Sequence, residues 1–328
     1  MRHGKIVHRG FTLRNMIPAL ERVQQAQKFL KSYLPQTRLR PAPSLGKSVH
    51  LKLETDLPTG SFKPRGALFA LAQAIAREKI SEVIASSTGN HGAAVAYAAS
   101  LLNVPARIFL PRNPNPVKRK RIADLGAQIV EVGAPDLVGS TAEALHYAKK
   151  PGVCFLNDAT DNDVPCGTGT IALEVLEQLP QAQAIYVPMG DTALIRGIAA
   201  AAKHLSPNIR IIGVQAERAP AYYLSWKQRT PVPTDTCDTI ADGLATRTPE
   251  ADNVSAIVEL LDDVKLVSEK QMLVAIRHLL LEEHIVAEPS GAATTAAWLN
   301  SPHDAETVLL VTGANIAPAV LRQAVCES

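Results

Sequence analysis

Several features that define particular classes of protein are scarce in this 328-residue chain. It has four cysteines, Cys154, Cys166, Cys237 and Cys326, and no Cys-x-x-Cys pair, so neither a zinc site nor a disulfide framework is expected. No apolar run reaches the roughly 18–20 residues of a membrane span. We therefore expect a protein of the reducing cytoplasm that is not bound to a membrane.

An excess of charge of one sign is also lacking, because 34 Lys and Arg and 31 Asp and Glu leave a net charge of +3. The densest basic run, residues 118–121, has no aromatic residues among its charges on which bases could stack. Its helical spacing turns Ile122 and Leu125 inward and the charges onto a solvated face. Nucleic-acid binding is therefore not expected. The Arg-rich first forty residues resemble a transit peptide, but we prefer a retained, ordered helix.

The sequence does contain a regular alternation of short apolar segments and helical patterns. A helix is predicted over 17–34 and an extended segment over 48–54. Further strands are predicted over 83–85, 106–110, 128–132, 153–156, 184–189, 209–216 and 307–312. Because these strands are short, apolar and separated by helices, they predict an α/β fold with mostly parallel sheets flanked by helices. The length predicts about two domains.

The segment Gly60-Ser61-Phe62-Lys63-Pro64-Arg65-Gly66-Ala67 carries the first chemical signal. Lys63 follows a Gly-Ser turn and adjoins an aromatic ring, and Arg65 is expected to repel a second positive charge, so its amine is predicted to be neutral. A neutral amine can form a Schiff base, although a solvated loop lysine fits the pattern too. The octapeptide resembles the cofactor-lysine motif of fold-type II pyridoxal-phosphate enzymes, especially threonine and serine dehydratases (ammonia-lyases) and serine racemases.

That resemblance implies a two-domain fold like that of the tryptophan synthase β subunit. Residues 1–80 and 159–328 would form a large cofactor-binding domain, and residues 81–158 a small mobile domain. Lys63 would hold pyridoxal 5'-phosphate as a Schiff base and later act as the base on the substrate α-carbon, with Phe62 beside the cofactor ring. A homodimer is expected, and a separate regulatory domain is not.

A second signal, Ser87-Thr88-Gly89-Asn90-His91, follows a predicted strand and opens a helix. Free amides at a helix N-terminus can bind a carboxylate, although an ordinary capped turn explains the same residues. The segment resembles the family's substrate-carboxylate loop, which implies that Ser87, Thr88, Gly89 and His91 bind substrate and that Asn90 bonds the phenolic oxygen of the cofactor. Thr88 keeps a hydroxyl where racemases have a second catalytic acid/base.

The third signal, Gly190-Asp191-Thr192-Ala193-Leu194, lies where the family usually has a run of glycines around the cofactor phosphate. A carboxylate near a phosphate dianion is unfavourable, so Asp191 is expected to face outward or cap the following helix. The backbone amides of these five residues and the Thr192 hydroxyl are expected to bind the phosphate.

A fourth signal, Thr312, ends the last predicted strand and by resemblance would bond the pyridine nitrogen. A neutral hydroxyl there suits elimination better than transamination. Segments 167–174, 239–245 and 288–293 also match the family, so the resemblance extends from about residue 51 to 315. Glu217 matches one metal ligand of some members, but Tyr223 replaces the matching aspartate, and no metal site is predicted.

The predicted function is β-elimination of a small hydroxy amino acid, such as L-threonine or L-serine, to a 2-oxo acid and ammonia. A hydroxyaspartate-type dehydratase and a serine racemase remain open, as does, more distantly, a β-replacement enzyme resembling cysteine synthase. A catalytically silent relative is disfavoured, because such a protein has no need for Lys63, Asn90 and Thr312 together. A dinucleotide-binding motif at Gly167-x-Gly169 is disfavoured, because about ten polar or turn-forming residues separate it from the preceding strand.

Overall fold

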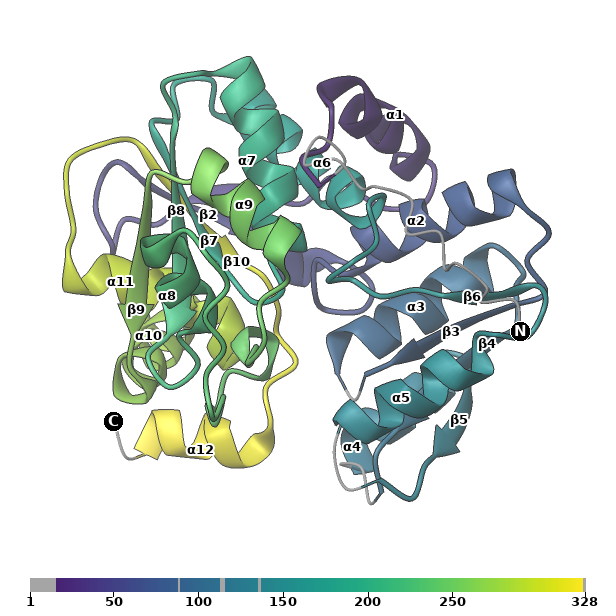
Figure 1. The fold of residues 1–328 in the computed structure, drawn as a ribbon. Coiled ribbons are helices and arrows are strands. Elements are labelled where there is room, and N and C mark those ends of the chain that lie inside the picture. The colour runs from purple at the N-terminus through teal and green to yellow at the C-terminus, as the bar shows by residue number, and fades with distance from the viewer. Residues whose placement is uncertain (1–15, 88, 113–115, 135–136, 327–328) are drawn as a thin grey trace.

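The structure, a computed structural model, describes residues 16–87, 89–112, 116–134 and 137–326. Its larger sheet has six strands, of which β1 is antiparallel to β2 and the other neighbours are parallel (Figure 1). In spatial order the strands are β1 (Leu39–Pro41), β2 (Val49–Leu53), β10 (Thr307–Val311), β7 (Ala184–Pro188), β8 (Arg210–Ala216) and β9 (Asp263–Val267).

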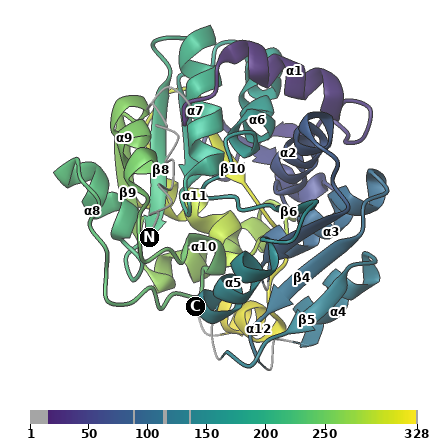
Figure 2. The same ribbon diagram turned by 45° about the vertical axis from the view of Figure 1, so that its right-hand side comes forward.

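The smaller sheet has four strands, and all of its neighbouring strands are parallel. Its spatial order is β5 (Gln128–Glu131), β4 (Ala106–Leu110), β3 (Glu82–Ser86) and β6 (Val153–Phe155). Helices α3 (Asn90–Leu101), α4 (Pro116–Asp124) and α5 (Leu137–Tyr147) connect these strands and cover the sheet (Figure 2). All four strands come from within the segment that the sequence assigns to a small domain, although the domain boundaries themselves stay a prediction.

The remaining helices pack around the larger sheet and between the two sheets. They are α1 (Leu20–Leu30), α2 (Pro64–Arg77), α6 (Val164–Gln178), α7 (Ala193–Leu205), α8 (Ala221–Gln228), α9 (Ala251–Leu260), α10 (Glu269–Leu281), α11 (Pro289–Asn300) and α12 (Pro318–Cys326). Helix α2 contacts both α3 and α6, so it joins the cores of the two sheets. Within the described ranges, no helix is both long and apolar enough to cross a bilayer.

The predicted fold class is confirmed, and the predicted strands are present with ends shifted by a residue or so. The first helix is shorter than predicted, because it runs only from Leu20 to Leu30. Two strands were missed. β1 is a three-residue edge strand that contains Pro41, and β9 is an edge strand whose central residues are half-buried, so neither has the continuous apolar character of the inner strands.

Candidate active site

Lys63 lies immediately before α2, at the point where this helix meets the carboxyl end of β10. Gly60 has a φ of +66°, a backbone conformation that favours glycine, and this turn redirects the chain towards the helix. The Phe62 amide then donates to the Thr312 carbonyl oxygen at 3.0 Å. The sequence elements around Lys63 and Thr312, far apart along the chain, are therefore adjacent, as the family resemblance requires.

The Lys63 amine is paired with a carboxylate rather than neutral. Its Nζ donates to Asp158 Oδ2, and the two side chains are only 22% and 15% exposed. Burial alone would lower the pKa of the Lys63 ammonium, but the charge and hydrogen bond of Asp158 outweigh it, with further contributions from Asp191 and Glu288, and the pKa is raised. This arrangement differs from the neutral amine expected from the sequence, because Asp158 supplies a partner that stabilises the charged form.

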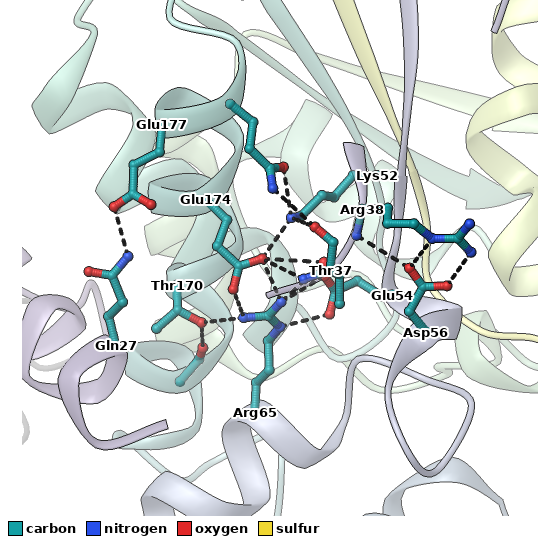
Figure 3. A network of polar contacts seen from close by, with 12 residues as sticks. Gln27, Thr37, Arg38, Lys52, Glu54, Asp56, Arg65, Thr170, Glu174 and Glu177 are labelled. Carbon is teal, nitrogen blue, oxygen red and sulfur yellow. Dashed lines mark hydrogen bonds and ion pairs between the residues drawn. The ribbon is translucent and has the colours of Figure 1, made fainter. Parts of the chain in front are cut away.

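The charge of Arg65 does not act on the Lys63 amine as expected, because the Arg65 guanidinium is paired with carboxylates in a separate buried network (Figure 3). The guanidinium of Arg65 is paired with Glu54 at 2.7 Å and with Glu174 at 2.7 Å. Lys52 adds a second cation, 2.6 Å from Glu174. This network ties β2, α2 and α6 together, so Arg65 fixes the helix whose start carries Lys63.

The loop from β3 to α3 brings the predicted substrate-binding residues to the same region. The Gly89 amide donates to Ser87 Oγ at 3.2 Å, and His91 Nε2 lies 2.9 Å from the Leu156 carbonyl oxygen. His91 Nδ1 lies 3.7 Å from Asp158 Oδ2. Thr88, the proposed second acid/base, lies outside the described residues.

Asn90 joins this loop to the larger sheet. Its Nδ2 donates to Glu288 Oε1 at 2.6 Å, and its Oδ1 accepts from Asn315 Nδ2 at 2.6 Å. Glu288 lies directly before α11, and its amide donates to the Gly313 carbonyl oxygen at 2.9 Å. Asn90 is thus held beside the end of β10, where it can meet a ring held between Lys63 and Thr312.

The loop from β7 to α7 contains the departure from the glycine-rich pattern. A Cβ on Gly190 would lie 2.2 Å from the Gly243 carbonyl oxygen, so only glycine fits at the start of this loop. Thr192 has a φ of +68°, which for a β-branched residue costs about 1–3 kcal/mol. Its left-handed conformation directly precedes α7, whose first residues are Ala193 and Leu194.

Asp191 neither faces outward nor caps α7 with its side chain, so this expectation is wrong. Its carboxylate is half-buried and accepts from Thr246 Oγ1 at 2.9 Å. Burial, and then the neighbouring Asp158 carboxylate, raise the pKa of Asp191. The segment 241–246 packs over this loop, and the side chain turns towards it instead of towards solvent.

Two buried polar residues bind both this loop and the loop that carries Asp158. Arg196 is fully buried, and its guanidinium donates to Thr192 Oγ1 at 3.1 Å and to the Ala159 carbonyl oxygen at 3.3 Å. Asn253 Nδ2 lies 3.0 Å from the same Ala159 oxygen and 3.4 Å from the Asp191 carbonyl oxygen. Burial lowers the pKa of Arg196 to about 10, so the guanidinium stays charged at neutral pH.

These residues fit a cofactor that combines an aldehyde, an aromatic ring and a phosphate. The amine of Lys63, the amide of Asn90 and the buried Thr312 converge from three separate segments. The amides at the N-terminus of α7 suit a phosphate, and the buried Arg196 charge behind them offsets the carboxylate of Asp191. Two mostly parallel sheets with a lysine of this kind between them define the class of fold-type II pyridoxal-phosphate enzymes.

Comparisons with known proteins agree with this class. Residues 31–313 match the model of a family described as "Pyridoxal-phosphate dependent enzyme". The chain is 34% identical to L-threonine ammonia-lyase of Thermotoga maritima over 90% of this chain and 75% of that protein. It is 32% identical to a catabolic L-threonine dehydratase of Staphylococcus aureus over 92% and 90%. The structure of maize serine racemase superposes with a TM-score of 0.88 at 27% identity, covering 94% of this chain and 96% of that one.

The chain therefore belongs to this family of pyridoxal-phosphate dependent enzymes, and its cofactor is pyridoxal phosphate. The predicted family, fold class and cofactor are confirmed. The roles of the individual site residues stay predictions.

The structure adds residues that the sequence did not single out as site residues: Asp158, Glu288, Asn315, Arg196 and Asn253. One signal was available for Asp158, because it closely follows a strand of a parallel sheet, and ligands bind at the carboxyl ends of such strands. Gly167 and Gly169 lie inside α6 and not at its start, which is a position unlike that of a dinucleotide-binding turn.

Across the parts of the chain that the structure describes, no group of three or more His, Cys, Asp or Glu lies close enough to hold a metal ion. Glu217 lines a surface hollow of about 470 Å³ together with Arg218 and Asp235.

Proposed function

We propose that this enzyme catalyses β-elimination of a small hydroxy amino acid, such as L-threonine or L-serine, to a 2-oxo acid and ammonia. The proposal rests on one observation: Lys63 and Asn90 both lie beside the end of β10, in a chain that is similar to L-threonine ammonia-lyase. The water lost in the elimination is regained when the product hydrolyses, so the overall reaction yields the 2-oxo acid and ammonia with no net release of water.

In this proposal the residues of the chain bind the reactants and move one proton. The N-terminus of α3 binds the substrate carboxylate through the amides and hydroxyls of the loop that contains Ser87 and Gly89, with His91 behind it. Asn90 and Thr312 hold the cofactor ring, and residues 190–194 hold its phosphate. Pyridoxal phosphate, when bound, supplies an electron sink for the pair left by the α-proton. The Lys63 amine takes that proton.

We also propose that residues 81–158 form a small domain that moves as a unit. Support comes from the smaller sheet, because all four of its strands belong to this segment. Arg121 on α4 donates to the Thr59 carbonyl oxygen at 2.7 Å and also to Asn315 Oδ1, which joins this segment to the larger sheet. Arg121 is therefore not part of a solvated basic face, unlike its exposed neighbour Lys120. Opening of the domain would break these contacts. A homodimer in the cytoplasm completes the proposal.

The test is to supply the purified protein with pyridoxal phosphate and a panel of L- and D-hydroxy amino acids, and to measure keto acid and ammonia. Borohydride reduction followed by mass spectrometry should place the added mass on the peptide that contains Lys63. The Lys63→Ala variant should lose both signals, whereas Lys47→Ala, which removes an exposed lysine, should keep them. Keto acid from none of the panel would refute the elimination.

Racemisation is a second candidate, because the structure of maize serine racemase is similar over most of both chains. The same incubation separates the two activities. Conversion of L-serine to D-serine without keto acid would favour racemisation, and keto acid without inverted serine would favour elimination.

A further inference from the structure

The Asp158 carboxylate is in direct contact with the Lys63 amine. The pair joins two segments that are 95 residues apart, the start of α2 and the loop after β6. The Phe62 ring lies beside the amine, with 5.4 Å between Lys63 Nζ and the ring centroid. The amine is therefore enclosed by a carboxylate and an aromatic ring.

The loop that carries Asp158 is anchored on both sides of this residue. Before it, the Asn157 side chain accepts from the Ala159 amide at 2.9 Å, and the Asn157 carbonyl oxygen accepts from the Asp161 amide at 2.9 Å. After it, the Ala159 carbonyl oxygen receives hydrogen bonds from Arg196 and Asn253. Because Arg196 and Asn253 also bind the loop of Asp191 and Thr192, the Asp158 carboxylate is fixed relative to the proposed phosphate loop.

The charged groups that face this pair come from three other segments. Asp191 precedes α7, Glu288 precedes α11, and both add negative charge near Lys63. His91 on α3 lies next to the carboxylate, with its Nδ1 3.7 Å from Asp158 Oδ2. Burial alone would raise the pKa of the Asp158 carboxyl, but His91 and Lys63 outweigh it and hold this pKa below its ordinary value. The pair is therefore ionised at neutral pH.

We infer that Asp158 is a positioning residue for the cofactor lysine: it holds the Lys63 amine as an ammonium at one place and controls when that amine becomes a nucleophile. The inference rests on Lys63 being the cofactor lysine, as proposed above. Bond formation needs the neutral amine. The ammonium first loses a proton to water, the nitrogen then adds to the aldehyde carbon, and the aldehyde oxygen leaves as water.

Removal of the Asp158 charge should therefore make the free amine more reactive. An opposite charge in contact shifts the titration of a group by about 1–3 pH units, and each unit changes the neutral fraction about tenfold. In Asp158→Asn we expect the titration midpoint of Lys63 to fall by about one unit or more. We expect attachment of pyridoxal phosphate at pH 7 to be about tenfold faster or more, since the nucleophilic form is more abundant.

The first measurement does not need the cofactor. Competitive acetylation of the full chain over pH 7–12, followed by mass spectrometry of the peptide with Lys63, gives the midpoint directly. Asp161→Asn is the matched control, because it removes a carboxylate from the same loop, one that accepts from the amides of Asp163 and Val164 and does not contact Lys63. Asp158→Glu, which restores a carboxylate, should return the midpoint towards that of the wild type.

The second measurement follows the absorbance of bound pyridoxal phosphate after mixing at several pH values. A lower midpoint and faster attachment in Asp158→Asn, with Asp161→Asn like the wild type, supports the inference. A midpoint in Asp158→Asn that equals that of Asp161→Asn overturns it, and circular dichroism of both variants shows whether they are folded. A shifted midpoint without any cofactor bond at Lys63, even in the wild type, would instead refute the proposed function, and would leave Asp158 as a residue that sets only the charge of the Lys63 amine.

Discussion

Replacement of Arg65 by Met tests whether the buried ionic network in Figure 3 stabilises the start of α2. Arg65 and Glu54 are 2% and 0% exposed, and their closest approach is 2.7 Å. Without the guanidinium, Glu174 keeps Lys52 as a partner at 2.6 Å, but Glu54 keeps only the Thr37 hydroxyl at 2.7 Å. The variant therefore leaves one carboxylate buried without a paired cation.

The expected loss follows from that uncompensated charge. Removal of one partner of a buried ion pair costs about 3–5 kcal/mol. An unfolding entropy of about 2.1 cal/mol/K per residue gives about 0.7 kcal/mol/K for a chain of 328 residues, so the melting midpoint should fall by about 4–7 °C. Differential scanning calorimetry at pH 7 and low salt measures this shift.

Arg38→Met provides a control of matched chemistry. Arg38 also meets a carboxylate, Asp56, at 2.7 Å, but its side chain is 68% exposed. Solvent screens such a pair, so its loss should cost no more than about 1 kcal/mol and shift the midpoint by less than about 2 °C. Addition of Glu54→Gln to Arg65→Met should recover part of the loss. Equal midpoints for Arg65→Met and Arg38→Met would refute the reasoning from burial.

Three further predictions concern charge in the site and its support. Asp191→Asn keeps an oxygen acceptor for Thr246 but removes a negative charge near the proposed phosphate loop. The Kd for pyridoxal phosphate, measured by fluorescence titration, should therefore fall by about threefold to tenfold. A higher Kd would contradict this placement of the phosphate. Burial would raise the pKa of Glu174, but the neighbouring Arg65 and Lys52 outweigh it and lower this pKa in the folded protein. The ionised Glu174 carboxylate therefore stabilises the fold above the pKa that Glu174 has in the unfolded chain, and this stabilisation is lost as the pH falls towards its pKa in the folded protein. Between pH 6 and pH 3, the melting midpoint of Glu174→Gln should decline less steeply than that of the wild type. A hydroxyaspartate substrate would bring a second carboxylate towards the carboxylates of Asp158, Asp191 and Glu288. The kcat/KM for keto acid formation should therefore be at least about tenfold lower for hydroxyaspartate than for L-threonine or L-serine. Equal kcat/KM values would contradict this prediction.

Much of the fold could be predicted because local pattern and tertiary structure agree. The inner strands are short apolar segments between helical patterns, and such segments are stable only inside parallel sheets covered on both faces. Edge strands carry less of that signal, and β1 and β9 were missed for this reason. The motif around Lys63 was informative because a turn, an aromatic residue and a lysine are consecutive in the chain.

The charge state of Lys63 and the orientation of Asp191 could not be predicted in the same way. The first depends on Asp158 and the second on Thr246, and each of these partners is distant in sequence and is brought into contact only by the tertiary structure. Arg65 illustrates the same limit. Its proximity in sequence suggested an effect on Lys63, but in an α-helix neighbouring side chains point in different directions, and Arg65 meets Glu54 and Glu174 instead.

The sequence by itself determined the α/β fold and the family, and it singled out the lysine proposed to bind the cofactor, since each is encoded in residues that are contiguous or regularly spaced. The tertiary structure alone decided which charges surround that lysine, how Asn90 is held by Glu288 and Asn315, and how Arg196 and Asn253 join two loops. Electrostatic interactions depend on distance in space and on burial, and neither quantity can be read from the order of residues along a chain.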